Sequence, residues 1–150
     1  MKATYVIGVG SPSGDDQAGW LVAQALENRL PPGVILTQLD RPGSALIPLL
    51  EKAGRVVLID AMQGSGSPGT IHHFRNDEWE DYRQGLSSHG LGVFDALMLA
   101  RELGCLPESI ELYGIEIGSS VLGDIPSEPI IAATAQLVEK IGADLLKHFP

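Results

Sequence analysis

Short apolar runs alternate with stretches of helical periodicity from one end of the chain to the other. The runs are rich in β-branched residues, which is typical of strands buried on both faces. The stretches between them repeat apolar residues every three or four positions, which is typical of helices with one packed face. The pattern predicts strands over 4–10, 33–40, 55–62, 70–74 and 109–118, and helices over 16–30, 43–54, 90–103 and 126–149.

This order of elements predicts an α/β fold, a three-layer sandwich with helices on both faces of a five-stranded sheet. The sheet should be mostly parallel, with 70–74 as an edge strand that can run antiparallel. The 150 residues contain no internal repeat and no linker long enough to separate two domains. A chain of this length fits one core, so we expect a single domain over 1–150.

Acidic residues stand where several of the predicted strands end. In such sheets, ligands bind outside the carboxyl ends of the strands, at the point where the strand order reverses. If the order begins with the second, first and third strands, Asp16 and Asp60 meet in one crevice, and Asp40 lies along the same edge. We expect Asp15 to cap the helix that follows it and Asp16 to face the crevice.

The glycine-rich stretch "GVGSPSGDD" (8–16) partly matches a dinucleotide-binding loop. Gly8 and Gly10 fit the start of the motif G-x-G-x-x-G, but Ser13 occupies the place of its third glycine. Asp15 and Asp16 stand where a phosphate would bind at a helix N-terminus, so they would repel it. The loop therefore favours a cation, and a dinucleotide enzyme stays as the less favoured alternative.

The four histidines differ in what their positions allow. His72 and His73 are adjacent on one predicted strand, so they face opposite sides and cannot both join one site. His148 is close to the end of the sequence and should be solvated. His89 lies in a predicted loop directly before a helix, from which it can reach over the strand ends.

Asp16, Asp60 and His89 together supply two carboxylates and one imidazole. That set suits a borderline divalent metal such as zinc, nickel, cobalt or manganese, and it leaves coordination positions open for water or substrate. The sequence contains no serine nucleophile motif and no cysteine cluster that would indicate a different chemistry.

Charge and composition exclude several classes of protein. The formal net charge of −9 argues against binding to nucleic acid, which depends on basic residues. One cysteine cannot form an internal disulfide, and this fits a reducing compartment. No apolar segment approaches the roughly 20 residues that span a bilayer. We therefore expect a soluble, cytoplasmic monomer with no membrane or nucleic-acid partner.

Three stretches carry a resemblance to a known family: "IGVGSPSGDDQAG" (7–19), "LIDAM" (58–62) and "SSHGLGVFDAL" (87–97). On these motifs the chain resembles the hydrogenase maturation proteases, although Ser11 stands where the family usually has Asn. The resemblance implies a mixed α/β sandwich. It also implies a cytoplasmic endopeptidase that removes the C-terminal peptide of a nickel–iron hydrogenase large-subunit precursor after nickel insertion.

Carried over to this sequence, the family's catalytic and metal-contacting residues are Asp16, Asp60 and His89. The implied partner is the large-subunit precursor, which itself carries the nickel, and no organic cofactor is implied. Two mechanisms stay open: the site recognises nickel that is already bound to the precursor, or a metal activates water or the scissile amide. A non-catalytic module that binds metal or a partner on the same fold is the alternative function.

Overall fold

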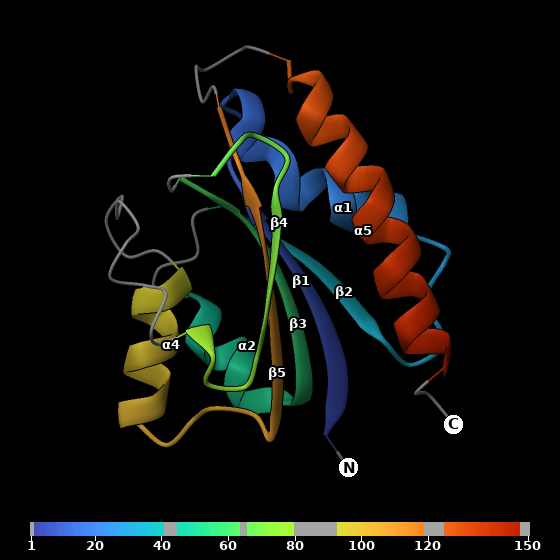
Figure 1. Ribbon diagram of the computed structural model, residues 1–150. Helices are drawn as coiled ribbons and strands as arrows, with labels where there is room; N and C mark the ends of the chain where they lie inside the picture. The colour runs from blue at the N-terminus through green and yellow to red at the C-terminus, as the bar shows by residue number, and fades with distance from the viewer. Residues whose placement is uncertain (1, 41–44, 64–65, 80–92, 119–124, 148–150) are drawn as a thin grey trace.

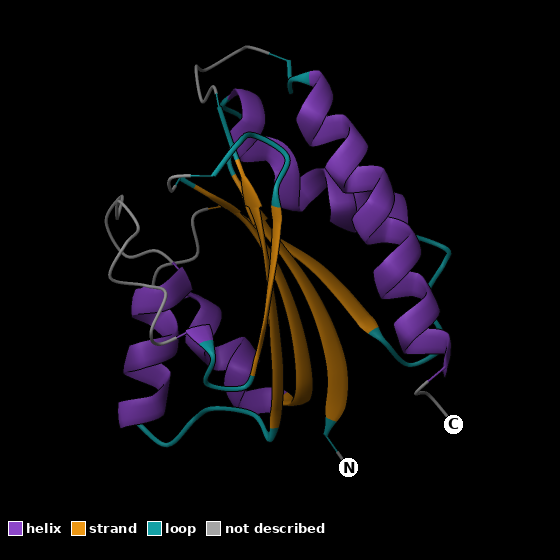
Figure 2. Cartoon of the chain, in the orientation of Figure 1, coloured by secondary structure: helices purple, strands orange, loops and turns teal. Residues whose placement is uncertain are grey.

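The chain folds as a five-stranded sheet between two layers of helices (Figures 1 and 2). The computed structural model describes residues 2–40, 45–63, 66–79, 93–118 and 125–147. The strand order is β2-β1-β3-β5-β4, in which β4 runs antiparallel to β5 and the other pairs are parallel. The predicted fold class and the antiparallel edge strand are confirmed. The strands are β1 Ala3–Gly10, β2 Ile35–Asp40, β3 Ala53–Met62, β4 Ile71–Arg75 and β5 Ser109–Glu116.

The helices divide between the two faces of the sheet. Helices α1 and α5 cover one face and α2 and α4 cover the other, called below the α1/α5 face and the α2/α4 face (Figure 1). A 3₁₀ turn, η1, precedes α1. The helical elements are η1 Gly14–Gln17, α1 Ala18–Leu26, α2 Leu46–Lys52, α4 Val93–Glu102 and α5 Glu128–Lys147.

Alternation along each central strand feeds two separate apolar clusters. On β3, Leu58 packs on the α2/α4 face, whereas Val57 and Ile59 pack on the α1/α5 face. Both faces of the central strands are covered, so the strand sequences read as continuous apolar runs. The apolar run of β3 ends at Asp60, which is only partly buried. The first polar side chain after the buried apolar run of β3 therefore stands near the carboxyl end of this strand.

The predicted helix over 16–30 is wrong at both ends. Its first residues form η1, and α1 extends only from Ala18 to Leu26. The helix stops because Asn28 adopts a left-handed conformation with φ of 71°, which asparagine tolerates better than most residues. Pro48 lies inside α2 but within its first turn, where the backbone N–H that proline lacks would have no helical partner.

Close backbone contact fixes α1 against the sheet. A Cβ atom on Gly19 would lie 2.0 Å from the carbonyl oxygen of Val9 and 2.5 Å from that of Ile59. A Cβ atom on Gly8 would lie 2.3 Å from the carbonyl oxygen of Gly19. Only glycine permits this approach, and it holds η1 directly over the ends of β1 and β3. Within the described ranges, no helix combines the length and apolar character that a bilayer crossing needs.

Candidate functional site

Two carboxylates meet at the carboxyl ends of β1 and β3. Asp16 follows β1 in η1, and Asp60 lies near the end of β3. β1 is flanked by β2 and β3, which makes its end the predicted point of reversal in strand order. Burial and the charge of Asp16 raise the pKa of Asp60, a hydrogen bond from the Ala61 backbone lowers it, and the net value is about 8. The structure therefore brings the two predicted acids into the same space.

Ser11 holds the Asp16 carboxylate in place. Its hydroxyl donates a hydrogen bond to Oδ2 of Asp16, and its backbone N–H donates to the Asp16 carbonyl oxygen at 3.1 Å. The Ser11 side chain is fully buried, so this donor is fixed in the turn and shielded from competing water. No role in the site was predicted for Ser11, because a serine in a glycine-rich loop is common and its partner lies five residues further on.

Asp15 does not cap the helix that follows it, contrary to the sequence prediction. It is fully buried, and its carboxylate reaches across the fold to the start of α5. Oδ1 accepts a hydrogen bond from the Ser127 backbone N–H at 2.7 Å, while Oδ2 accepts from the Ser127 hydroxyl and from the Gly118 backbone N–H, both at 3.0 Å. Asp15 therefore ties the first loop to the segments that follow β5 and precede α5.

His89 falls outside the described residues, so its place in the site stays a prediction. Among the residues that the structure does describe, no three His, Cys, Asp or Glu side chains form a group that could hold a metal ion. Asp40 lies at the end of β2, paired in register with Gly10 at the same edge of the sheet, and it is exposed. The described part of the site is thus the pair of acids, Asp16 and Asp60.

The acid pair can hold either a proton or a cation. With a pKa of about 8, Asp60 is mostly protonated at neutral pH, because burial disfavours its charged form and the charge of Asp16 disfavours it further. In that state the pair offers one acid and one base, the combination used in general acid–base catalysis. A divalent cation between the carboxylates would displace the proton, since both oxygens could then stay ionised. The donor set therefore fits a metal ion supplied from outside.

The glycines of the first loop serve packing against η1 and α1. A Cβ atom on Gly10 would lie 2.9 Å from the carbonyl oxygen of Asp16, and Gly8 packs against Gly19 of α1. A short 3₁₀ turn, η1, replaces the helix N-terminus that would receive the phosphate. The loop therefore resembles a dinucleotide-binding loop in sequence but differs from it in what its glycines contact.

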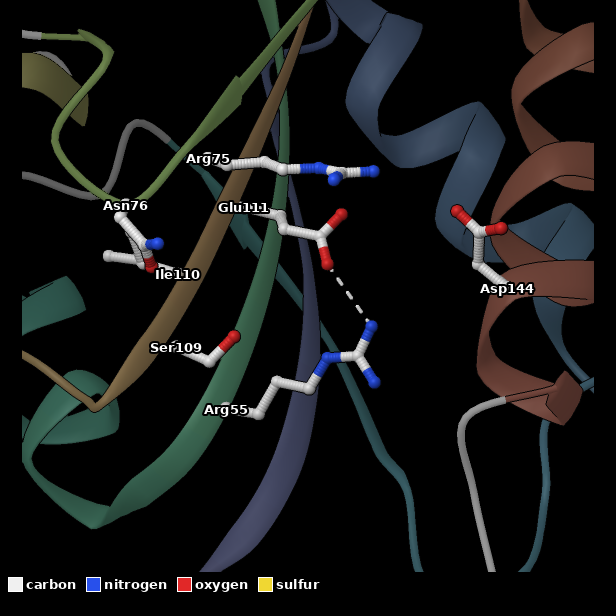
Figure 3. A pocket seen from close by; sticks show the side chains of 7 residues that line it. All are labelled: Arg55, Arg75, Asn76, Ser109, Ile110, Glu111 and Asp144. Atoms are coloured by element: carbon white, nitrogen blue, oxygen red, sulfur yellow. Dashed lines mark hydrogen bonds and ion pairs between the residues drawn. The ribbon is translucent and has the colours of Figure 1, made fainter.

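A cavity at the opposite edge of the sheet contains none of the predicted site residues (Figure 3). It measures about 200 Å³ and lies on the α1/α5 face, lined by Arg55, Arg75, Glu111 and Asp144 among others. Arg55 pairs with Glu111 at 3.1 Å. Burial alone would raise the pKa of Glu111, but the hydrogen bonds and charges of His73 and Arg55 outweigh it and hold that pKa below its ordinary value. The ion pairs account for the polarity of this cavity.

Comparison with known proteins identifies the family. The sequence model described as hydrogenase maturation protease, HycI, matches residues 22–143. The chain belongs to the hydrogenase maturation protease family. This membership confirms the resemblance drawn from the sequence motifs, including its assignment to a protease family. The match begins after Asp16, so the first acid is placed by the fold rather than by the sequence model.

Two solved structures of this family share the fold over nearly the whole chain. The hydrogenase maturating endopeptidase HybD from E. coli aligns with a TM-score of 0.84 and 25% identity, covering 98% of this chain and 94% of its own. The nickel–iron hydrogenase maturation protease HycI from Thermococcus kodakarensis aligns with a TM-score of 0.76 and 27% identity, covering 96% and 92%.

Curated relatives are longer than this chain. The hydrogenase expression/formation protein HupD from Rhodobacter capsulatus is 27% identical over 139 residues, which span 83% of this chain and 66% of HupD. HupM from Azotobacter chroococcum is 28% identical over 116 residues, and the match spans 56% of its length. The chain thus spans between about half and two thirds of the curated relatives that it matches.

Proposed function

We propose that this chain is the endopeptidase that removes the C-terminal extension of a nickel–iron hydrogenase large-subunit precursor, using the inserted nickel as its recognition element. Membership of the hydrogenase maturation protease family supports the reaction class. The observation that carries the proposal is the acid pair: Asp16 and Asp60 lie at the carboxyl ends of β1 and β3, and burial and the charge of Asp16 raise the pKa of Asp60 to about 8.

The nickel in this proposal belongs to the substrate. A metal ion in the precursor would present positive charge to two acids that cannot both ionise readily in its absence. Asp16 and Asp60 would contact it directly, and His89 is proposed as the third ligand. The protein's part is to orient Asp16 through Ser11 and to hold Asp60 at the end of a rigid strand. Cleavage would then depend on whether the precursor has been loaded.

The test compares nickel-loaded and nickel-free precursor incubated with the purified chain, with the product mass read by mass spectrometry. We expect loss of the C-terminal extension from the loaded form alone. Binding of the loaded precursor without any trimming would overturn the protease assignment in favour of a non-catalytic binding module. Equal cleavage of both forms would overturn nickel recognition while leaving the peptidase activity in place.

Variants then test the residue assignment. Asp16→Asn, Asp60→Asn and His89→Ala should each reduce cleavage at least a hundredfold, in line with the loss of a catalytic or charge-stabilising group. Asp40→Asn is the matched control, because this acid lies at the same sheet edge but is exposed at the end of β2. Wild-type rates for Asp16→Asn or Asp60→Asn would remove that residue from the site.

A further inference from the structure

Two large apolar side chains are exposed where α5 begins. Ile125, three residues before the helix, is 85% exposed, and Ile131 is 55% exposed. Pro129 and Ala132 are exposed as well, and residues three positions apart are neighbours on a helix surface. These four residues, called below the α5 patch, give the beginning of the helix an apolar outer surface. Single exposed apolar residues are ordinary, but a group of them marks an interaction site.

The remainder of α5 has a different outer surface. The stretch 129–138 contains no charged residue. Four charged residues follow before the helix ends: Glu139, Lys140, Asp144 and Lys147. Leu146 is 62% exposed, but it stands between two of these charged residues in the last turn. A continuous uncharged outer surface is therefore confined to the first half of α5.

Asp15 connects the α5 patch to the acid pair. Its carboxylate accepts hydrogen bonds from the Ser127 backbone N–H and hydroxyl at 2.7 and 3.0 Å, and Asp16 is the next residue. Ile131 lies one turn beyond Ser127, because its backbone N–H donates to the Ser127 carbonyl oxygen at 3.1 Å. Ile125 precedes Ser127 by two residues, so covalent dimensions keep the Cα atoms of Ile125 and Asp16 within about 20 Å. The beginning of α5 thus lies at the same end of the molecule as η1 (Figure 1).

A folded substrate would have to cover this end of the molecule. The argument from here on rests on the proposed function, in which the precursor already holds nickel when it is cleaved. Such a precursor is folded around its metal and meets the protease as a protein surface. Specific protein–protein interfaces bury roughly 800 Å² on each partner, far more than two carboxylates offer. The surface next to the acid pair must supply the rest, and the cores of interfaces are depleted in charged residues.

A second copy of this chain is the other protein that could cover the α5 patch. A dimer joined there would place the partner copy close to Asp16 and narrow the approach of a folded precursor. Charge opposes it as well, because each copy carries a formal net charge of −9 and like-charged copies repel one another. The precursor is therefore the favoured occupant.

We propose that the α5 patch is the docking surface for an apolar patch on the large-subunit precursor, with Ile125 and Ile131 as its main contacts. A contact at this distance from the acid pair is made equally in the ground state and the transition state, so it acts on KM rather than on kcat. The acid pair then recognises the nickel, and the α5 patch binds the protein that surrounds it.

Steady-state cleavage of the nickel-loaded precursor by Ile125→Gln, Ile131→Gln and the double variant tests the docking surface. We expect the double variant to raise KM at least tenfold with kcat within twofold of wild type, and each single variant to raise KM less. Leu146→Gln is the matched control, because it makes the same kind of change on the same helix, about 22 Å further along from Ile131. It should leave both constants unchanged. Circular dichroism checks that every variant is folded.

Several outcomes would overturn the proposal. These are a wild-type KM for the folded double variant, an equal rise in KM for Leu146→Gln, and a fall in kcat at constant KM. Analytical ultracentrifugation tests the other occupant. A wild-type dimer that the double variant converts to a monomer would assign the α5 patch to a second copy of the chain instead.

Failure of the proposed function would look different. Absence of cleavage by the wild-type protein refutes the endopeptidase, but docking is still measured by biolayer interferometry with the loaded precursor. Both arms of that experiment carry Asp60→Asn, so that no substrate is consumed. Adding Ile125→Gln and Ile131→Gln should weaken binding at least tenfold. Equal affinities, or no binding of the precursor in either arm, would refute the docking surface.

Discussion

Replacing the two neighbouring acids of the first loop should have opposite consequences. Asp15 is fully buried and accepts three hydrogen bonds from Gly118 and Ser127. Asp16 is partly exposed and stands beside Asp60. The same change, aspartate to asparagine, should therefore destabilise the fold at Asp15, whereas at Asp16 it should abolish cleavage and leave stability intact.

The magnitude for Asp15 follows from its donors. Hydrogen bonds to a charged acceptor contribute about 1.5–3 kcal/mol each, and a buried donor left unpaired costs about 1–3 kcal/mol. An asparagine has one acceptor oxygen, so its amide nitrogen must face an N–H donor of either Ser127 or Gly118. We expect Asp15→Asn to lower the free energy of unfolding by about 2–4 kcal/mol.

Asp16 gives a different expectation because its partner can adapt. The Ser11 hydroxyl donates to an amide oxygen as readily as to a carboxylate oxygen. Loss of the Asp16 charge also removes its repulsion of Asp60. The unfolding free energy of Asp16→Asn should therefore stay within about 0.5 kcal/mol of wild type or rise slightly.

Urea denaturation and precursor cleavage, each measured on both variants, check these expectations. Cleavage is assayed at a temperature where both proteins are folded. Asp15→Asn should keep activity within tenfold of wild type, whereas Asp16→Asn should lose at least a hundredfold. An unfolding free energy of Asp15→Asn within about 0.5 kcal/mol of wild type would refute the role of Asp15 as a buried tie between the first loop and α5.

Three further predictions concern packing and titration. Gly19→Ala should lower the free energy of unfolding by about 3 kcal/mol or more. Gly142→Ala in α5, where a Cβ atom would meet nothing within 4 Å, should raise it by about 0.5–1 kcal/mol. Urea denaturation of both variants measures these changes. Burial and a neighbouring charge raise the pKa of Asp60 from 3.8 to about 8. The free energy of unfolding should therefore fall as pH rises between these two values, by at most about 1.4 kcal/mol per pH unit. Urea melts from pH 5 to 8 should show this fall for wild type and not for Asp60→Asn. Basic partners outweigh burial and hold the pKa of Glu111 below 4.5, so melts of Glu111→Gln should show a smaller loss of stability below pH 4.5 than wild type.

The arrangement of the sheet was predictable because local patterns constrain it strongly. Apolar runs separated by helices force parallel strands, and right-handed crossovers leave few strand orders. Once β1 is placed between β2 and β3, Asp16 and Asp60 must approach one another. This prediction needed only the positions of Asp16 in the loop after β1 and of Asp60 near the end of β3, and no contact between side chains had to be known.

The role of Asp15 was unpredictable for the opposite reason. Its donors, Gly118 and Ser127, lie more than a hundred residues further along the chain, so no local signal distinguishes it from an ordinary helix cap. The same holds for the nearness of Ile125 to the acid pair, which depends on the bond between Asp15 and Ser127. The place of His89 stays a prediction, because that residue lies outside the described part of the chain.

The first loop combines a group that stabilises the fold with one that destabilises it. Asp15 and the close packing of Gly19 secure the turn, while Asp16 is held beside Asp60 and disfavours the ionised form of that acid. Without this support the turn could relax and separate the two carboxylates. Replacing Asp60 by asparagine should therefore stabilise the protein at neutral pH, because an amide gives up no ionisation when it is buried, and it should remove the activity that depends on an acid pair ready for a cation from the substrate.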